Sequence, residues 1–390
     1  MDWLAFKKRF PLPDDEVFLN TATLGCPANS VIEALSQSQR GLASTIAHWE
    51  YLNDDREWIT GYTPEIKLRN RLGRLFGADP SEISLTQNAT MGINFIAHGL
   101  DWRPGDEVIQ TDQEHPGARC PWDALTERYG IVVRRAALPI PIREPAEIIN
   151  SIKSALTNRT KLLAIPHITS GLGTLLPVKE LCACARERGV ITLVDGAQTP
   201  GHVALNIADI GADAYSASLH KWLLAPAGNG FLHVRKKLAD KIWPTQASES
   251  WRSPDTGFRL QQRGTGNPSL LRALDAALDV FEETGPQNWC GRIKALGDYL
   301  RRSIREAPDL NARLRFNSSL HPELCAGITS VELTNIPSPA VVRRLWDNRK
   351  IRVRDVGEPY GLRISAAAYT QEYEIDKLVM GLRELCSAAP

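Results

Sequence analysis

The chain has 390 residues, enough for a large hydrophobic core and two domains. Hydrophobic residues make up 43% and charged residues 23%, which suits a globular enzyme, and a net charge of +1 gives no general attraction to nucleic acid or an anionic membrane. No apolar run approaches the roughly 20 residues that span a bilayer, and residues 1–15 lack the apolar core of a signal peptide, so we expect a cytoplasmic protein.

The cysteines are scattered along the chain, and their odd number, seven, is unlike a disulfide framework. Cys182 and Cys184 stand two residues apart in a helical pattern, where side chains point in different directions, so they are unsuited to sharing a metal ion. We therefore expect buried, reduced thiols and no metal site.

The N-terminal part of the chain contains few regular patterns. Residues 1–19 are expected to form an arm that prolines interrupt, and residues 17–27 a short strand and a turn, followed by a helix over 30–43. The segment 48–62 is unusually aromatic and polar, and it is either a packed helix–loop pair or part of a substrate pocket.

Strand and helix patterns then alternate, which predicts a parallel sheet flanked by helices. Each of the segments 83–100 and 105–125 has the pattern of a strand followed by a helix, with the first helix beginning near Ala89. Further strands are expected at 130–135, 161–165, 191–194 and 212–218, and further helices at 66–76, 144–156 and 178–188.

The C-terminal third has a different organisation. An edge or returning strand is expected within 228–237, a loop over 245–263, and helices over 263–278 and 288–307. Short strands around 326–333, 351–357 and 361–369, with a helix at 338–348, then predict a smaller α+β domain.

Two of the expected strands end at residues that suit one cofactor. Ile191–Val194 precedes Asp195, and Ala212–Ser218 precedes Lys221; ligands bind at this end of the strands in open α/β sheets. Pyridoxal 5′-phosphate (PLP) requires a lysine to form a Schiff base and a carboxylate beside its pyridine nitrogen. Asp195 and Lys221 could fill these roles, with Gln198 bonding the 3′-oxygen of the ring. The alternative is a structural aspartate and a solvated lysine.

The motifs Asp195-Gly196-Ala197-Gln198 and Ser218-Leu219-His220-Lys221, in this order and spacing, resemble the class V aminotransferase family of fold-type I PLP enzymes. This family includes cysteine desulfurases, selenocysteine lyases, isopenicillin N epimerase and kynureninase. The run HKWLLAPAGNGFLHV looks most like the epimerase branch. The resemblance implies a PLP-dependent transferase fold, with a large, mainly parallel-sheet α/β/α domain at 20–285 and a small domain at 286–390 that the arm 1–19 joins.

The resemblance also assigns residues to the cofactor. It implies that Lys221, His115 and Asp195 are catalytic, with the His115 imidazole stacked on the PLP ring. It implies a homodimer with a shared active site, in which Thr265 reaches the phosphate of the neighbouring subunit. The remaining cofactor contacts that it implies are Ala89, Thr90, Ser170, Gln198, Ser218 and His220.

For the substrate, the resemblance implies an amino acid or a similar small molecule. Arg363 would clamp its α-carboxylate with two parallel hydrogen bonds, and Asn20 would lie near the active site. An arginine in a structural salt bridge is the alternative for Arg363.

The reaction class stays open at this stage. The freed Lys221 amine would remove the α-proton, and the outcome is then an epimerisation, a C–S or β-lyase reaction, or a transamination. Desulfurases carry a nucleophilic cysteine on the loop before the clamping arginine, but Arg352–Leu362 contains none, so we do not expect a desulfurase. A PLP-fold protein that only binds or regulates is the remaining alternative.

Overall fold

The computed structural model describes residues 1–46, 63–262 and 264–387. The aromatic segment predicted at 48–62 lies outside these residues. Among the helices in the described ranges, none has the length and apolar character needed to cross a membrane.

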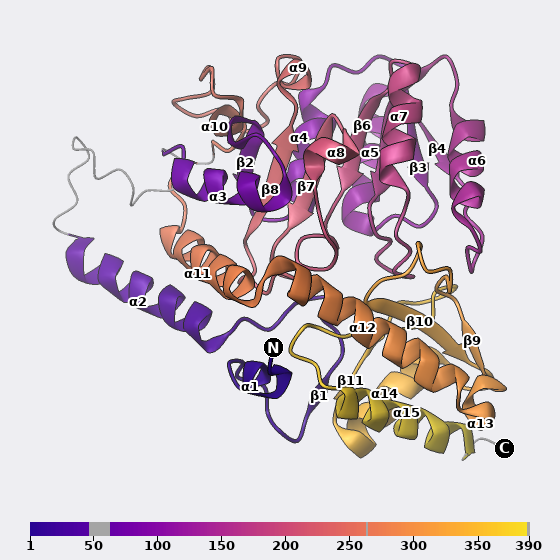
Figure 1. The fold of residues 1–390 in the computed structure, drawn as a ribbon. Helices are drawn as coiled ribbons and strands as arrows, with labels where there is room; N and C mark the ends of the chain where they lie inside the picture. The colour runs from indigo at the N-terminus through magenta and orange to yellow at the C-terminus, as the bar shows by residue number, and fades with distance from the viewer. Residues whose placement is uncertain (47–62, 263, 388–390) are drawn as a thin grey trace.

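The larger part of the molecule is built on a seven-stranded sheet with the order β2-β8-β7-β6-β5-β3-β4 (Figure 1). Within the sheet as described, β8 alone runs in the direction opposite to the other strands, so the sheet is mainly parallel as predicted. The predicted returning strand is therefore correct, but β8 lies inside the sheet and not at its edge. The strands are β2 (Ile83–Thr86), β3 (Glu107–Thr111), β4 (Val132–Ala136), β5 (Thr160–Pro166), β6 (Ile191–Asp195), β7 (Ala214–Ser218) and β8 (Gly230–Val234).

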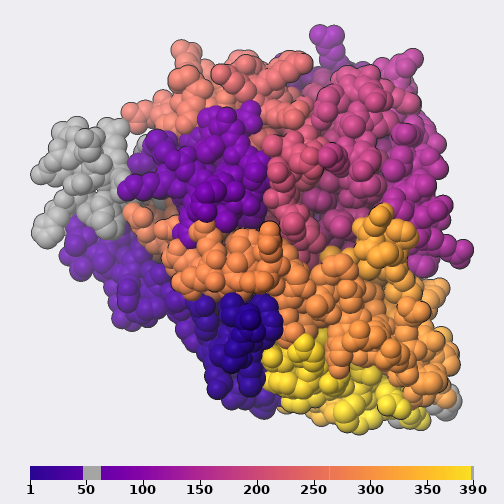
Figure 2. Space-filling view, viewed as in Figure 1, coloured from indigo at the N-terminus to yellow at the C-terminus, as the bar shows by residue number. Residues whose placement is uncertain are grey.

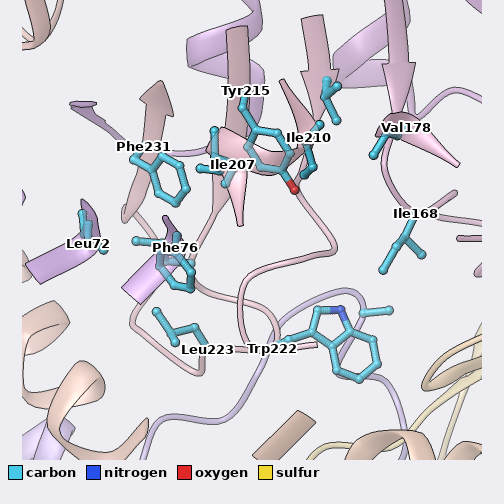
Figure 3. Close-up of a cluster of buried hydrophobic side chains, with 14 of the residues drawn as sticks. Leu72, Phe76, Ile168, Val178, Ile207, Ile210, Tyr215, Trp222, Leu223 and Phe231 are labelled. Atoms are coloured by element: carbon cyan, nitrogen blue, oxygen red, sulfur yellow. The ribbon is translucent and has the colours of Figure 1, made fainter. Parts of the chain in front are cut away.

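Helices cover both faces of this sheet, because its central strands are apolar on both sides. Neighbouring residues such as Leu162 and Leu163 of β5 enter different hydrophobic clusters. One cluster includes side chains from α4 (Ala89–Gly99) and α5 (Pro116–Tyr129). The other includes side chains from α3 (Ile66–Phe76), α6 (Pro145–Ala155), α7 (Val178–Glu187) and α8 (Ile207–Ile210). Figure 3 shows part of the second cluster, where Tyr215 and Phe231 of the sheet lie near Phe76 and Ile207.

The remaining elements of the large sheet region connect its strands or pack beside them. The helix α10 (Thr256–Leu260) falls inside the segment 245–263, so the prediction of a loop there was wrong in part. Asp255 caps α10 by accepting a hydrogen bond from Phe258 N. Such a local bond leaves no periodic pattern in the sequence. The elements are α2 (Asn29–Thr45), α3 (Ile66–Phe76), the 3₁₀ helix η3 (Pro80–Glu82), α6 (Pro145–Ala155), α7 (Val178–Glu187), α8 (Ile207–Ile210), α9 (Lys236–Ala239), α10 (Thr256–Leu260) and α11 (Pro268–Thr284).

The C-terminal part contains a four-stranded antiparallel sheet with the order β12-β13-β10-β9, which has its own hydrophobic cluster. This is the α+β organisation that the sequence predicts. Its elements are α12 (Pro286–Arg305), α13 (Pro308–Asn311), β9 (Leu314–Phe316), β10 (Ile328–Leu333), α14 (Ser338–Arg349), β11 (Ile351–Arg352), β12 (Arg354–Asp355), β13 (Leu362–Ser365) and α15 (Glu372–Ser387). We propose Gly285, between α11 and α12, as the boundary of this small domain.

The N-terminal arm lies against both parts of the molecule (Figures 1 and 2). Its helix α1 (Trp3–Lys7) places Phe6 edge-on against Trp289, and Phe10 contacts Tyr369. The short strand β1 (Val17–Phe18) then pairs in parallel with β11. The chain that follows β1 is thereby led to the junction between the two sheets.

Candidate active site

A cavity of about 600 Å³ lies where the strands β3, β5, β6 and β7 end and the small domain begins. Its lining comes from both sheets and from the turn after β1. The large-domain side includes Asp195 and Lys221, and the small-domain side includes Arg354, Tyr360 and Arg363. This is the sheet edge at which the sequence predicted a site.

Asp195 and Lys221 both line the cavity, and their charges interact. One carboxylate oxygen of Asp195 accepts a hydrogen bond of 2.8 Å from Ala197 N, and burial raises the pKa of Asp195. Burial lowers the pKa of Lys221 to about 8; the attraction of Asp195 opposes this shift, and the positive charge of Arg363 adds to it. The structure therefore brings together an acid and an amine that can be neutral near physiological pH.

His115 lies on the other side of the same cavity and begins α5. Its Nδ1 accepts a hydrogen bond of 3.0 Å from Gly117 N, so the neutral ring carries its proton on Nε2. Burial, together with the positive charge of Lys221, lowers the pKa of His115 to about 4. The imidazole is therefore neutral at ordinary pH and can receive a proton or contact an aromatic ring.

Glu114, beside His115, is a cavity residue whose charge the sequence does not reveal. Its carboxyl group accepts hydrogen bonds from the backbone N–H and the hydroxyl of Thr111. Burial nevertheless raises the pKa of Glu114 to about 8, and the negative charge of Asp195 contributes to the rise. At neutral pH this group is mainly a carboxylic acid.

The beginning of α4 forms a further wall of the cavity. Asn88 caps the helix by accepting a bond from Met91 N, which confirms the predicted start at Ala89. Ala89 N donates to Ser218 Oγ at 3.0 Å, which fixes this helix end against β7. Thr90 also lines the cavity. A helix N-terminus with unused N–H groups favours an anion such as phosphate.

Other predicted site residues hold the surrounding backbone. Gln198 lines the cavity, but its amide nitrogen donates to Ala22 O and its amide oxygen accepts from the Trp222 indole. Ser170 lines the cavity beside it, and its carbonyl oxygen accepts a bond from Arg363.

Arg363 crosses from the small domain into the cavity. Its Nη1 donates to Ser170 O at 2.7 Å, and its Nη2 donates to Thr23 Oγ1 at 2.6 Å and to Asn20 Oδ1 at 3.3 Å. Asn20 thus holds Arg363 and is not itself among the residues that line the cavity as described. Burial lowers the pKa of Arg363 to about 10, and the positive charge of Arg354 contributes.

Three cavity residues were missed by the sequence reasoning. Thr23 accepts hydrogen bonds from both Arg363 and Arg354, and Tyr360 closes the cavity from the small domain. The sequence held one usable signal: Arg354 precedes the Gly-Glu-Pro-Tyr-Gly loop that leads to Arg363. Thr265, by contrast, is exposed just before α11 and is not among the residues that line this cavity in the described chain.

A model of the aminotransferase class-V family matches residues 43–378. The chain belongs to the class V aminotransferase family. It is 32% identical to an isopenicillin N epimerase of Streptomyces clavuligerus over 98% of both chains. It is 29% identical to a cysteine desulfurase of Cronobacter sakazakii, over 81% of this chain and 80% of the desulfurase. The resemblance inferred from the two motifs is thereby confirmed.

Among solved structures, the chain is similar to the cystine C–S lyase C-DES in complex with cysteine persulfide, its reaction product. The TM-score is 0.86 at 25% identity, and the match covers 96% of this chain and 99% of the lyase. A mutant of the same lyase has glycine covalently linked to its PLP cofactor. The fold is thus that of the fold-type I PLP enzymes, and this protein is a PLP-dependent enzyme.

The side chains of the cavity fit this cofactor. The Nδ1 atom of His220 is buried and has no hydrogen-bond partner within the described parts of the chain, although His220 lines the cavity next to the N-terminus of α4. An orphaned polar atom at a site with free N–H groups indicates a missing polar partner. A lysine of lowered pKa and a buried carboxylate complete the set of groups that PLP requires.

Proposed function

We propose that the enzyme removes the α-proton of an amino acid that carries a second anionic group. Either a proton is then delivered to the opposite face of the α-carbon, which is epimerisation, or a substituent leaves the β-carbon, which is a C–S or β-lyase reaction. PLP, when bound, supplies the aldehyde that captures the substrate amine and the ring that withdraws electrons from the α-carbon. The chain supplies the groups that bind the substrate and move its proton.

The observation that carries this proposal is that Lys221 and Arg363 line the same cavity. Lys221, with a pKa of about 8, is partly neutral near pH 7 to 8 and can accept a proton from carbon. Arg363 presents a guanidinium group on the opposite domain, suited to a carboxylate. Asp195 in this proposal keeps the pyridine nitrogen of the cofactor protonated, and His115 contacts the ring.

The cofactor phosphate is placed by the same reasoning at the N-terminus of α4. Ala89 and Thr90 lie there, and Ser218 and His220 approach from the end of β7. The support is the orphaned Nδ1 of His220 together with the positive end of the helix dipole. Ser170 and Gln198 would lie along the oxygen-bearing edge of the ring.

A second arginine supports a substrate with two negative charges. Arg354 and Arg363 are directly opposite each other on β12 and β13, so their side chains lie on one face of the sheet. Both donate to Thr23 Oγ1, at 3.0 and 2.6 Å. Two cations held this close repel each other, and an anion bound between them would offset that repulsion. Cystine, on which the similar lyase acts, has two carboxylates.

The thiols of this chain argue against a persulfide carried by the protein. Of the residues that the structure describes, those lining the cavity include no cysteine. Cys325 is buried, and its backbone forms a bridge with Thr174. The epimerase and the C–S lyase are therefore better guides to the reaction than the desulfurases. Transamination remains the alternative outcome of the same first proton transfer.

The decisive experiment is the absorption spectrum of the purified enzyme with PLP, followed by product analysis. We expect a visible Schiff-base band that disappears in Lys221→Ala and persists in Lys179→Ala, whose lysine is exposed and paired with Asp209. Pyruvate with a released persulfide from cystine, or pyruvate with a released thiol from a thioether substrate, would identify a lyase, and an inverted α-carbon would identify an epimerase. A colourless protein that takes up no added PLP would refute the proposal.

We also propose that the enzyme is a homodimer in the cytoplasm and that Thr265 reaches the partner's cofactor. Thr265 is exposed and lies just before α11, at some distance in the chain from the cavity residues, which leaves it accessible to a second subunit. Analytical ultracentrifugation would give the mass of the holoenzyme. A monomer that retains PLP would refute this arrangement.

A further inference from the structure

The loop between β12 and β13 carries one large side chain, Tyr360, and its backbone is firmly held. Tyr360 N donates to Gly357 O at 2.8 Å, and Asn317 Nδ2 donates to Tyr360 O at 3.1 Å. The hydroxyl of Ser330 donates to the same carbonyl oxygen. Gly361 follows with φ +79, and a Cβ there would lie 2.6 Å from Val331 O. The position of Tyr360 is therefore fixed by the small domain.

The Tyr360 side chain, however, leaves the small domain and lies on the large one. A Cβ placed on Gly171 would be 3.0 Å from Cγ of the Tyr360 ring, so the ring rests on a residue that has no side chain. The Tyr360 hydroxyl lies 3.4 Å from Asp112 O, a weak hydrogen bond in which the hydroxyl donates. Gly171 and Asp112 follow β5 and β3, so the ring bridges the domains at the cavity wall.

The surroundings of the ring are suited to an apolar segment that ends in a charge. Tyr360 lines the cavity between the large-domain edge and the hairpin that bears Arg354 and Arg363. The charged and titratable groups that act on its hydroxyl are Asp112, Glu114 and Arg119. The aromatic face offers the contact that aliphatic chains and divalent sulfur favour.

We propose that Tyr360 is a specificity-determining residue whose ring forms the wall of the substrate's side-chain subsite. An unbranched side chain, such as a thioether or disulfide chain, passes between the Tyr360 ring and the cavity floor and places its terminal anion at Arg354. Gly171 is part of this subsite, because any larger residue there displaces the ring. The inference deepens the proposed function and rests on it for the class of substrate.

The test measures binding and not turnover. Amino acids with a methyl group on the α-carbon have no α-proton, so they bind without reacting. Isothermal titration of the PLP holoenzyme would compare two such analogues, one with an unbranched anionic side chain and one with a bulky benzylthio group. In Tyr360→Ala we expect the unbranched analogue to bind about tenfold more weakly and the bulky one no more weakly, since a ring contact of this size contributes about 1.4 kcal/mol.

Two further variants separate the wall from other roles of Tyr360. Tyr360→Phe keeps the ring and should retain the preference for the unbranched analogue; a loss as large as that in Tyr360→Ala would overturn the proposal in favour of the hydroxyl bond to Asp112. Gly171→Ala should change the preference when Tyr360 is present and have no further effect in Tyr360→Ala. If Gly171→Ala changed the preference equally in the wild type and in Tyr360→Ala, the proposal would also be overturned.

The proposal and the proposed function fail in different ways. If neither proton exchange at the α-carbon nor product forms from any amino acid, the proposed function fails, while the binding ratios still test the wall. If the enzyme turns over substrates but the ratio of the two binding constants is the same in wild type and Tyr360→Ala, only the Tyr360 proposal fails.

Discussion

The two sides of the cavity hold their polar groups in different ways. On the large-domain side, Asp195 and His115 each accept a hydrogen bond from a backbone N–H two residues further along the chain. On the small-domain side, Arg363 donates to three residues from two segments more than 190 positions away in the sequence. The catalytic side is therefore built locally, and the recognition side depends on how distant segments dock.

This difference predicts that substitutions on the large-domain side change turnover, whereas substitutions on the small-domain side change substrate affinity. The largest effect is expected from Asp195→Asn. The amide has nearly the shape of the carboxylate and can keep its bond to Ala197 N, but it has no negative charge to favour a protonated pyridine nitrogen. We expect kcat to fall by a factor of about 100 or more, with KM nearly unchanged.

Asp195→Glu is the matched control, since it keeps the charge and should retain more activity than the amide variant. The absorption spectrum of both variants should show bound cofactor, because Lys221 is intact. Full activity in Asp195→Asn would remove this assignment and would leave the large-domain side without its strongest electrostatic group.

Arg363→Ala tests the other side of the comparison. Loss of a charge-assisted contact to a carboxylate is expected to cost about 2 kcal/mol, which corresponds to a rise in KM of about thirtyfold, with a smaller change in kcat. Steady-state kinetics with the best substrate would measure both parameters. Arg363→Lys keeps the charge without the two parallel hydrogen bonds, so its KM should lie between those of the wild type and Arg363→Ala. An unchanged KM would show that the carboxylate binds elsewhere.

The large-domain side could be predicted from the sequence because its signals are local. Asp195 and Lys221 follow short apolar strands, and Ala89 follows an asparagine that caps a helix, so each position is visible in a few neighbouring residues. The alternation of strands and helices likewise predicted the parallel sheet. The helix α10 was missed because it has five residues, too few for a periodic pattern.

The small-domain side could be predicted only in part. The family motif identified Arg363, but nothing near Thr23 in the sequence shows that its hydroxyl accepts bonds from two arginines more than 300 residues away. Tyr360 and Gly171 meet only because the two domains dock. Gln198 was expected at the cofactor, and its amide also ties Ala22 to Trp222, which no local pattern indicates.

Thr23→Val should have a smaller effect than the loss of Arg363 itself. Valine keeps the shape of threonine but removes the oxygen that accepts from both guanidinium groups. Loss of one neutral acceptor costs about 1 kcal/mol, so we expect KM to rise by about fivefold with kcat preserved. Thr23→Ser should behave as wild type. A fall in kcat without a change in KM would contradict the division between the two sides.

The smallest effect, and the one that involves both sides, concerns the stability of the cofactor-free protein. The pKa of Lys221 is about 8 in the folded chain, below the usual lysine value of 10.5. Between these two values the unfolded chain binds a proton that the folded chain has lost, so stability should rise as the pH increases from about 8 to 10.5. Because the side chain also faces the open cavity, we expect a gain of only about 1 kcal/mol.

Denaturant unfolding of the apoprotein and of apo Lys221→Met, at several pH values, isolates this gain as the difference between the two proteins. If the free energies of unfolding of the two proteins change in the same way with pH, the pKa of Lys221 is not lowered. Two more variants should move the pH window in opposite directions. Asp195→Asn removes an attraction that favours the charged amine, so the rise should begin at a lower pH. Arg363→Ala removes a repulsion, so the rise should begin at a higher pH, because the recognition side acts on the catalytic amine through its charge.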